Sequence, residues 1–212
     1  SEDTRRRASG DARELRLEVM RFAREKGENP IEAWQEVEKA LEIQASLDEF
    51  ERSGVHARYH SCDVGDRDAL ANTLEKIRAE DGPIEGLLHG AGFSRDARID
   101  HKRPEHVARC FRSKLDGAFH LMDLTLKDPI RHFVAMGSIS GRFGANGQSD
   151  YSLANDMLAK LVSWYRGQRP DVAAVNFDWH AWDDFGMATR AETRLALESI
   201  GMRFMPAREG AS

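Results

Sequence analysis

The sequence predicts an α/β fold in which helices flank a parallel sheet, and two features of the chain support this prediction. After Gly54, short apolar runs alternate with segments of helical pattern. Polar residues and glycines follow the ends of those apolar runs. Such alternation is typical of βαβ units, in which a helix connects neighbouring parallel strands. With 212 residues the chain is long enough for one sizeable core, so one domain is the default expectation.

The segment 1–53 differs from the rest of the chain. It is rich in Glu, Arg, Lys and Ala and has no run that resembles a buried strand, which predicts helices. Pro30 suits the first turn of one of them. We expect 1–53 to be a charged helical insert or linker packed on the remaining part, 54–212; a helix dedicated to a partner protein is the alternative. The apolar residues at helical spacing are Ile31, Trp34, Val37, Leu41, Leu47 and Phe50.

Strands and helices are expected to alternate in 54–212, followed by an irregular tail. The expected strands are 55–64, 84–90, 130–138 and 172–179; the helices cover 66–80, 104–126 and a segment that begins near Tyr151; the tail 180–208 combines a loop and a short helix. Right-handed crossovers would bring the carboxyl ends of the strands to one edge of the sheet, where α/β proteins bind ligands. The residues at those ends are Asp63, the glycines of HGAG at 89–92, Ser138 and Asp178.

Composition and charge argue against several classes of function. A net charge of −5 provides no basic surface for nucleic acid. Cys62 and Cys110 form no CxxC pair, which argues against a disulfide framework or a thiolate zinc site and favours the reduced cytosol. No apolar run approaches the roughly 18 residues of a membrane span, and the first residues hold no signal-peptide core. We therefore expect a cytoplasmic protein with no metal and with no nucleic-acid or membrane partner.

The segment 137–155, GSISGRFGANGQSDYSLAN, holds the best candidates for chemistry. Ser138 ends an apolar strand and Tyr151 opens the next helix, so both should face the carboxyl edge of the sheet. A tyrosine, with a reference pKa of about 10, donates a proton near neutral pH only if a nearby cation stabilises its phenolate. The residue four positions after the tyrosine is Asn155, so the cation must come from elsewhere. A purely structural serine and tyrosine is the alternative.

Lys114 is the candidate for that cation. It lies one turn before Gly117, in the middle of a helix that should pack along the sheet. A glycine inside a helix costs about 1 kcal/mol, which a close approach of another group to the helix would explain. A solvated surface lysine is the alternative. The glycines of HGAG fit either a tight turn after a strand or the approach of a flat ligand to the backbone.

Five runs taken together resemble a known family. They are CDVGDRDAL, IEGLLHGAG, SKLDGAFHL, FVAMGSISGRFGANGQSDYSLAN and NFDWHAWDDFGM, in the family's order and spacing. Residues 55–210 thereby resemble the ketoreductase domain of multifunctional type I polyketide synthases, in the short-chain dehydrogenase/reductase superfamily with its Rossmann-like parallel sheet. The charged segment 11–53 further resembles the ketoreductases of iterative polyunsaturated-fatty-acid and enediyne synthases.

The resemblance implies NADPH-dependent reduction of a β-ketoacyl thioester, bound to an acyl carrier protein, to the β-hydroxyacyl thioester. Ordinary relatives carry YxxxK, whereas polyketide ketoreductases resemble a swapped version with YxxxN and a lysine from the preceding long helix. On this resemblance Tyr151 would protonate the substrate oxygen and Ser138 would hydrogen-bond to it. Lys114 would lower the pKa of Tyr151 and organise a proton relay with Asn155.

The resemblance also implies two further groups of residues. Those expected at the cofactor are Asp63, Val64, His89, Gly90, Ala91 and Gly92, with Asp63 at the adenine. Those expected on the substrate and lid side are Asp96, Phe143, Gln148, Trp182 and Met187, while Trp179 fits the core and the lid equally well. Family members that make the D-hydroxyl carry an LDD motif, and those that make the L-hydroxyl carry a tryptophan eight residues before the tyrosine. Here the last Asp persists as Asp96 and the tryptophan is absent, which favours the D product.

One part of the family's pattern is missing from the sequence. No GxGxxG or GGxxG run precedes the helical segment, although a dinucleotide fold uses such a run to hold the pyrophosphate. We therefore expect a sheet that lacks the first βαβ unit, a chain cut from within a larger synthase, and weak NADPH binding by the isolated chain. A non-catalytic, structural remnant of a ketoreductase is the alternative. The intact set of Lys114, Ser138, Tyr151 and Asn155 favours catalysis in the parent domain.

Overall fold

The computed structural model describes residues 2–183, 186, 191–199 and 201–210. The chain divides into two compact units, 1–61 and 62–212, each with its own internal contacts. This division lies between Ser61 and Cys62, and the boundary expected between 53 and 54 stays a prediction.

The first unit is built from two helices, α1 (Glu2–Glu25) and α2 (Pro30–Arg52), that pack against each other. Gly27 makes the turn between them with a φ of 74°, in the left-handed region that favours glycine. Asn29 caps α2, because its side-chain oxygen accepts the N–H of Ile31 at 3.0 Å. Pro30 opens the helix. The helices expected in this segment are therefore confirmed.

The apolar residues of α2 are at most partly covered by protein. None of the residues of this helix, all of them described, is buried, and Ile31 is 60% exposed. A shallow groove along the helix is lined by Ile43, Leu47, Phe50 and, from the segment that follows the helix, Tyr59.

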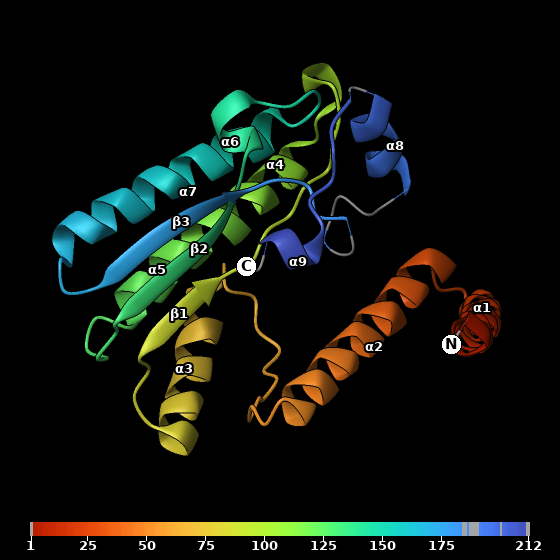
Figure 1. Ribbon diagram of the computed structural model, residues 1–212, viewed down its shortest axis with the longest axis horizontal. Helices are drawn as coiled ribbons and strands as arrows, with labels where there is room; N and C mark the ends of the chain where they lie inside the picture. The colour runs from red at the N-terminus through yellow and green to blue at the C-terminus, as the bar shows by residue number, and fades with distance from the viewer. Residues whose placement is uncertain (1, 184–185, 187–190, 200, 211–212) are drawn as a thin grey trace. The chain divides into compact units, whose positions relative to one another are not determined.

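The second unit is organised around a parallel sheet of three strands, β1 (Gly86–His89), β2 (His132–Ser138) and β3 (Ala173–Trp179), in that spatial order. Figure 1 shows the three arrows side by side, with their tips at the same edge. The register pairs His89 with Ala135 and Ser138 with Trp179. Three of the four expected strands are thus confirmed, and every end lies within two residues of its expected position.

The strand expected at 55–64 is wrong. This segment has neither helix nor strand, and its backbone hydrogen bonds are local, such as that from the N–H of Val55 to Phe50 O at 2.8 Å. A strand exists only when a neighbour completes its backbone hydrogen bonds. No described strand lies beside 55–64, so its alternating pattern has no partner with which to form a ladder.

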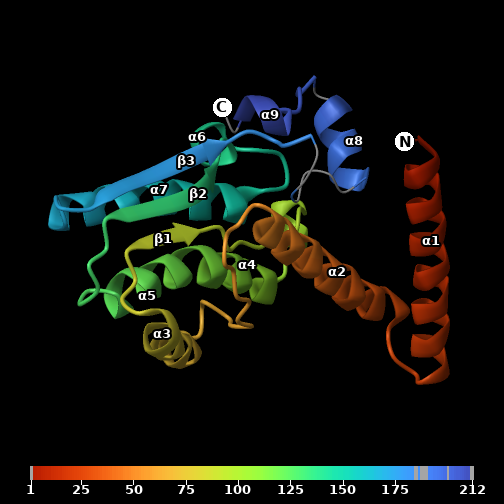
Figure 2. The same cartoon turned by 60° about the horizontal axis from the view of Figure 1, so that its bottom comes forward.

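Three long helical segments connect and cover the strands. They are α3 (Arg67–Asp81), the composite segment α4 (Pro104–Phe111), η2 (Arg112–Asp116) and α5 (Gly117–Leu124), and α7 (Ser149–Gln168). The short elements are η1 (Ile99–His101), α6 (Ser140–Phe143), α8 (Ala191–Ser199) and α9 (Ala207–Gly210). Figures 1 and 2 both place α5 and α7 along one face of the sheet. The helices expected at 66–80, 104–126 and from Tyr151 are confirmed.

The two faces of the sheet differ in how well they are covered. On the helical face Phe133 and Ala135 of β2 are fully buried against side chains such as Leu158 of α7. On the opposite face Leu88 is 65% exposed and Phe177 is 43% exposed. Parallel sheets are usually covered on both faces. Here the described part of the chain covers only the helical face well, because Leu88 and Phe177 stay exposed on the other.

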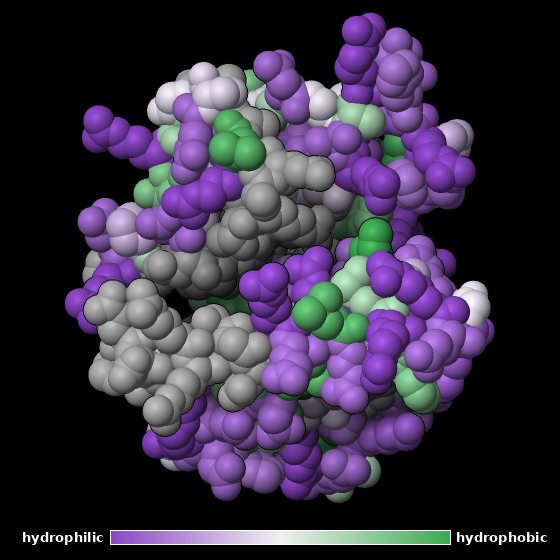
Figure 3. Space-filling view, turned by 90° about the vertical axis from the view of Figure 1, so that its right-hand side faces the viewer, coloured by the Kyte–Doolittle hydropathy of each residue, from purple (hydrophilic) through white to green (hydrophobic). Residues whose placement is uncertain are grey.

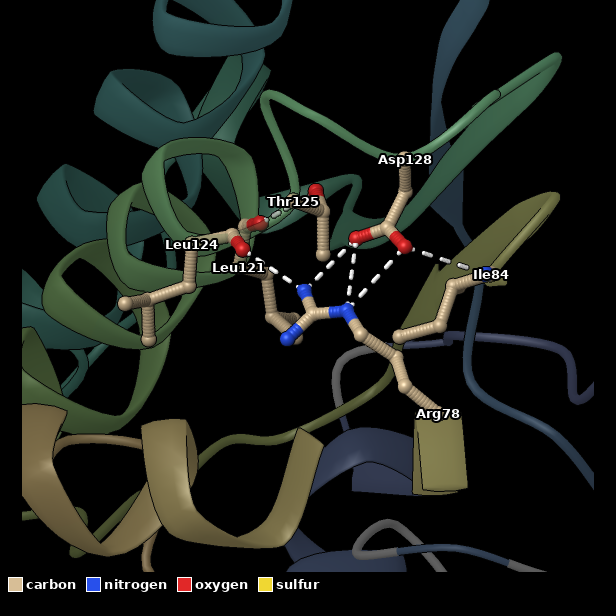
Figure 4. A network of polar contacts seen from close by, with 6 residues as sticks. All are labelled: Arg78, Ile84, Leu121, Leu124, Thr125 and Asp128. Carbon is tan, nitrogen blue, oxygen red and sulfur yellow. Dashed lines mark hydrogen bonds and ion pairs between the residues drawn. The ribbon is translucent and has the colours of Figure 1, made fainter. Parts of the chain in front are cut away.

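A polar network joins the amino ends of the strands to α3 and α5 (Figure 4). Arg78, in the last turn of α3, donates through its guanidinium to both carboxylate oxygens of Asp128, at 2.6 and 3.1 Å. The same guanidinium donates to Leu124 O at 2.8 Å, and Asp128 also accepts the N–H of Ile84 at 3.2 Å. The ion pair raises the pKa of Arg78 and lowers that of Asp128, so both groups stay charged at neutral pH.

One face of the molecule is drawn with its side chains in Figure 3. In the view of Figure 3 hydrophilic residues predominate, and hydrophobic ones form small separate groups. Among the helices of the described residues, none is both long enough and apolar enough to cross a bilayer.

Candidate functional site

The carboxyl edge of the sheet brings Ser138 and Tyr151 together. Ser138 is the last residue of β2, and Tyr151 lies in the first turn of α7, after the short helix α6 has reversed the chain. The side chains of Ser138 and Asn155 lie near the Tyr151 phenol, and both act to lower its pKa. The Ser138 hydroxyl also accepts the N–H and the hydroxyl of Ser140, at 3.2 and 3.0 Å. These bonds fix the Ser138 oxygen beside the phenol.

Tyr151 is buried in a small cluster of its own. It is 9% exposed and packs with Cys110 and Ala154, with Phe93 and Phe111 around them. Burial raises the pKa of Tyr151, while the nearby Asn155 and Ser138 side chains act in the opposite direction. The phenol is therefore protonated at neutral pH, which is the state that a proton donor requires.

Lys114 of η2 extends its side chain toward the Tyr151 ring. Its side chain is buried, with 3% of the residue exposed, and its Nζ lies 6.0 Å from the centre of the Tyr151 ring. The ammonium donates to Met136 O of β2 at 2.5 Å. Burial lowers the pKa of Lys114 to about 8. The surface-lysine alternative is thus wrong, and the lysine lies next to the tyrosine as the resemblance implied.

The helix that carries Lys114 is widened at that point. Residues Arg112–Asp116 form a π-helical turn, in which the N–H of Gly117 donates to Arg112 O, five residues back. Such turns are rare and often occur at functional sites. The expected helix 104–126 is correct in extent, but nothing in its pattern indicated the π-helical turn.

Asn155 is fully buried and only partly satisfied. Its amide nitrogen donates to Tyr151 O, one turn earlier, at 2.8 Å. Its Oδ1 has no protein partner among the described residues. A buried acceptor without a partner costs about 1–3 kcal/mol, so this oxygen has capacity for a water or a ligand group. Lys114 and Asn155 bind different groups here, and the relay expected between them stays a prediction.

The residues expected at the cofactor lie in two segments, 63–64 before α3 and 89–92 at the end of β1. A Cβ on Gly92 would come within 3.0 Å of the Lys114 side chain, so the glycine lets this loop approach the lysine closely. Gly90 and Ala91 precede it in the same loop after β1. Asp63 is ion-paired with Arg112 at 3.3 Å and accepts the N–H of Gly65 at 2.9 Å.

The glycine inside the helix is explained by close packing. A Cβ on Gly117 would come within 2.7 Å of Val64 and 3.2 Å of His89, so both side chains rest directly on the helix backbone. The Nε2 of His89 lies 2.9 Å from Lys114 O and donates to it. Burial lowers the pKa of His89 to about 4, so the ring is neutral, and its Nδ1 has no partner among the described residues.

The residues expected on the substrate side fall into two places. Asp96 accepts the amide of Gln148 at 2.9 Å and the hydroxyl of Ser94 at 2.7 Å, which ties the loop after β1 to the start of α7. Phe143, at the end of α6, is 84% exposed.

The tryptophan of the expected lid, Trp182, follows β3, and Trp179 is the last residue of that strand. Trp182 packs on Trp179, with ring centres 4.7 Å apart, and Trp179 also stacks on Phe177. Trp179 is half-buried, so its burial does not distinguish the core from the lid, the two places that the sequence allowed. Met187 lies outside the described residues.

Sequence reasoning missed one pair at the site. Lys102 and Asp150 form an ion pair at 2.6 Å, with side chains 6% and 5% exposed, directly before Tyr151 in the chain. Lys102 belongs to a charged run, HKRPE, of the kind that is typical of a solvated surface. In the structure its side chain is buried. The sequence contains no signal for that burial.

The described residues fit part of a nicotinamide dinucleotide. The open acceptor of Asn155, the glycine loop 90–92 and the Tyr151–Lys114 pair fit the reactive half of such a cofactor. The described segments contain no strand, glycine-rich loop and helix of the kind that holds a pyrophosphate. They also contain no group of three or more His, Cys, Asp or Glu side chains that could hold a metal ion.

Comparison with known proteins identifies relatives of this site. The family model described as KR domain matches residues 14–184. The phenolphthiocerol synthesis polyketide synthase type I Pks15/1 of Mycobacterium marinum is 34% identical over 158 residues, which cover 74% of this chain and 7% of that protein. The chain therefore corresponds to a small part of that relative's length.

Solved structures agree with this match. A ketoreductase domain from the bacillaene assembly line superposes with a TM-score of 0.70 at 30% identity, over 79% of this chain and 42% of that one. A short chain dehydrogenase from Burkholderia cenocepacia in complex with NADP superposes with a TM-score of 0.68 at 16% identity, over 77% of this chain and 70% of that one. At that identity the second likeness shows a common fold.

Proposed function

Since the chain belongs to the KR domain family of type I polyketide synthases, we propose that it provides the catalytic half of a ketoreductase. In this proposal the complete domain reduces a β-ketoacyl thioester, carried on an acyl carrier protein, with NADPH. The observation that supports it most is the buried phenol of Tyr151, with Ser138 and Asn155 near it and the Lys114 ammonium 6.0 Å from the centre of its ring. Other domains of the parent synthase would be its partners.

The cofactor would lie along the carboxyl edge of the sheet. The loop Gly90–Gly92 and the buried pair of Lys114 and Tyr151 would contact its nicotinamide half, and Asp63 would contact its adenine. When bound, the reduced nicotinamide supplies a hydride to the carbonyl carbon of the substrate. The NADP-bound relative of low identity supports this choice by fold alone.

Tyr151 would supply the proton. As negative charge develops on the substrate oxygen, the phenol donates its proton to it, and the C=O double bond becomes a C–O single bond with a new hydroxyl. Ser138 would hydrogen-bond to the same oxygen. Positioned acid catalysis of this kind is worth about 10²- to 10⁴-fold.

Lys114 would stabilise the phenolate that remains. Its pKa of about 8 leaves most of the ammonium charged at neutral pH, and a buried positive charge near the ring favours the deprotonated phenol. As the pH rises through that value, the ammonium loses its charge and the stabilisation disappears. The open Oδ1 of Asn155 would accept a hydrogen bond from the water that returns a proton to Tyr151.

Asp96 and Gln148 would meet the substrate. The Gln148 amide donates to the Asp96 carboxylate, and this carboxylate contributes to raising the pKa of Tyr151. Phe143 and Trp182 would border the acyl chain. The retained Asp96 and the absence of a tryptophan at position 143 support a D-hydroxyl product.

The test uses the complete ketoreductase domain of the parent chain with a simple β-ketoacyl thioester and NADPH. We expect Tyr151→Phe to lose at least 10²-fold in kcat with little change in KM, because only the proton donor is removed. The matched control is Tyr59→Phe, which makes the same change at a half-exposed tyrosine of the first unit and should leave turnover unchanged.

Two outcomes would contradict the proposal. Unchanged turnover in Tyr151→Phe would remove Tyr151 from the acid role. A wild-type domain that folds, binds NADPH and turns over no β-ketoacyl thioester would instead support a structural, non-catalytic role for the domain.

A further inference from the structure

The buried ion pair of Lys102 and Asp150 is not explained by packing alone. In the part of the chain that the structure describes, it is the one ion pair in which both side chains are less than 10% exposed. Burying two charges costs several kcal/mol per ion before their attraction is counted, so such a pair is weak evidence for stability. Asp150 immediately precedes Tyr151 in the chain, which places the pair next to the candidate functional site.

Asp150 holds the first turn of α7 in place. Its Oδ1 accepts both the Lys102 ammonium at 2.6 Å and the backbone N–H of Tyr151 at 3.0 Å. The first N–H groups of a helix have no partner within the helix, and a carboxylate at this end is also favoured by the helix dipole. The carboxylate that Lys102 neutralises is therefore bound directly to the backbone of Tyr151.

Lys102 also holds the loop that carries Asp96. Its ammonium donates to Arg95 O at 3.2 Å, next to Asp96 in the chain. The same loop is bound to the residues before α7 through the N–H of Ala97, which donates to Gly147 O at 3.0 Å. One buried cation thus connects the loop after β1 with the start of α7.

We propose that Lys102 and Asp150 are positioning residues that hold the backbone of Tyr151, and with it the phenol, in place, and that Lys102 neutralises the carboxylate that precedes Tyr151 in the chain. This inference rests on the proposed function only for its consequence in catalysis. The placement of Tyr151 and the charge beside it are properties of the protein without substrate.

Removing one partner and removing both have different consequences. Without Lys102, Asp150 is a buried, unpaired carboxylate one residue from Tyr151, and a nearby negative charge disfavours the phenolate. Without both charges, the added negative charge is absent. The other titratable or charged groups around the phenol stay the same in every variant: Cys110 from α4, Lys114 from η2 and Asp96 from the loop after β1.

The first experiment measures the pKa of Tyr151 without turnover. The complete ketoreductase domain is labelled with ¹³C at the tyrosine ring carbon that bears the hydroxyl, its NMR signal is followed over pH, and Tyr151→Phe assigns the resonance. We expect Lys102→Met to raise the pKa of Tyr151 by about one unit, and Lys102→Met/Asp150→Asn to return it to the wild-type value. Lys102→Arg, which keeps the cation, should also match the wild type.

The matched control is Lys160→Met. Lys160 lies on the same helix and pairs with Asp156, but its side chain is 70% exposed, so its removal should leave the Tyr151 pKa unchanged. A pKa of Tyr151 that is the same in Lys102→Met and the wild type would overturn the proposal, and so would an equal rise in the double variant. The double variant keeps the test decisive if Lys102→Met fails to fold, because it must then fold with a wild-type Tyr151 pKa.

A second experiment connects the pair with catalysis. In the same domain with a β-ketoacyl thioester and NADPH, we expect Lys102→Met to lower kcat about tenfold, because a misplaced catalytic group costs one to two orders of magnitude. If the wild type turns over and Tyr151→Phe does not, an unchanged kcat in Lys102→Met refutes this positioning role alone. If Tyr151→Phe is as active as the wild type, the proposed function fails while the NMR result still decides the inference.

Discussion

The two ends of the parallel sheet differ in how far their polar side chains are paired with protein groups. At the amino end, the Arg78 guanidinium and the Asp128 carboxylate bind each other, and their remaining bonds go to backbone groups of neighbouring segments (Figure 4). At the carboxyl end, the ammonium of Lys114 is 3% exposed and donates to a neutral carbonyl. There the Nδ1 of His89 and the Oδ1 of Asn155 have no partner among the described residues.

This difference separates structural from chemical use of polar groups. A satisfied network holds secondary structure together, and its members keep their charge over the neutral range. A lysine with a lowered pKa, next to a tyrosine with a raised one, is costly to fold but supplies groups that can exchange protons. We expect substitutions at the two ends to affect different measurements, activity at the carboxyl end and stability at the amino end.

The sharpest contrast should come from Lys114→Met. We expect kcat of the complete domain to fall at least 10²-fold, because the phenolate of Tyr151 loses its cation. We expect the free energy of unfolding at pH 7 to stay the same or to rise by up to about 2 kcal/mol, because a buried ammonium is removed. Turnover and chemical denaturation of the same preparation measure the two effects.

The pH dependence of stability checks the sign of this effect. The pKa of Lys114 is about 8 in the fold against 10.5 for an ordinary lysine, so its cost to stability is present below pH 8 and disappears as the pH rises to 10.5. The stability advantage of Lys114→Met should shrink over that interval. Lys76→Met, at an exposed lysine of α3, should change neither quantity. A variant with wild-type turnover and lower stability would contradict the comparison.

The opposite result is expected for Asp128→Asn. The variant keeps the size of the side chain but loses the charge that binds the Arg78 guanidinium, which is 31% exposed and so regains part of its hydration. We expect a loss of about 2 kcal/mol in the free energy of unfolding and unchanged kcat per folded molecule. Urea denaturation and turnover of the complete domain measure these quantities.

Two controls accompany Asp128→Asn: a substitution in an exposed ion pair, and a measurement of stability at acid pH. Asp123→Asn breaks a pair with Arg67 whose side chains are 36% and 53% exposed, and it should cost less than about 1 kcal/mol. Because its pair with Arg78 lowers the pKa of Asp128, that stabilisation is present above the ordinary carboxyl value of 3.8 and is lost as the pH falls through the lowered one. Wild type and Asp128→Asn should therefore converge in stability below pH 4. A constant difference down to pH 2 would refute the role of this charge.

The smallest effect is expected for Gly117→Ala, next to His89 at the carboxyl end of β1. Alanine favours the helix by about 1 kcal/mol, but its Cβ would lie 2.7 Å from Val64 and 3.2 Å from His89. Because the clash costs about 1–3 kcal/mol, we expect a net loss of about 1 kcal/mol, read as a lower Tm. Gly167→Ala, at a position with open space around it, should raise the Tm slightly. A more stable Gly117→Ala would show that Val64 and His89 do not rest on the helix.

Most of the fold and the centre of the site could be predicted from the sequence. The run FVAMGS and the alternation after it led to β2, Ser138 and Tyr151, because local pattern and strand ends determine which residues meet at a sheet edge. Lys114 was found because the chemistry of a tyrosine requires a cation. Its burial and its lowered pKa follow from packing that a single sequence does not show.

The errors have one physical origin. The strand expected at 55–64 has the right local pattern, but a strand depends on a neighbour that the described chain does not provide. The buried pair of Lys102 and Asp150 was missed for the related reason that burial is decided by distant segments. Local pattern predicts what a segment can form, and only tertiary contacts decide whether it does.

The π-helical turn at Arg112–Asp116 makes the number of residues in this segment as important as their identity. A π-helical turn corresponds to an α-helix with one extra residue, so deleting a single residue here would restore an ordinary α-helix and leave α4 and α5 in the same orientation. Gly117 would still pack on Val64 and His89, and only the side chains inside the turn, Lys114 among them, would change direction. A one-residue gap in an alignment of this helix would therefore predict different surroundings for the lysine between two flanking helices that still align.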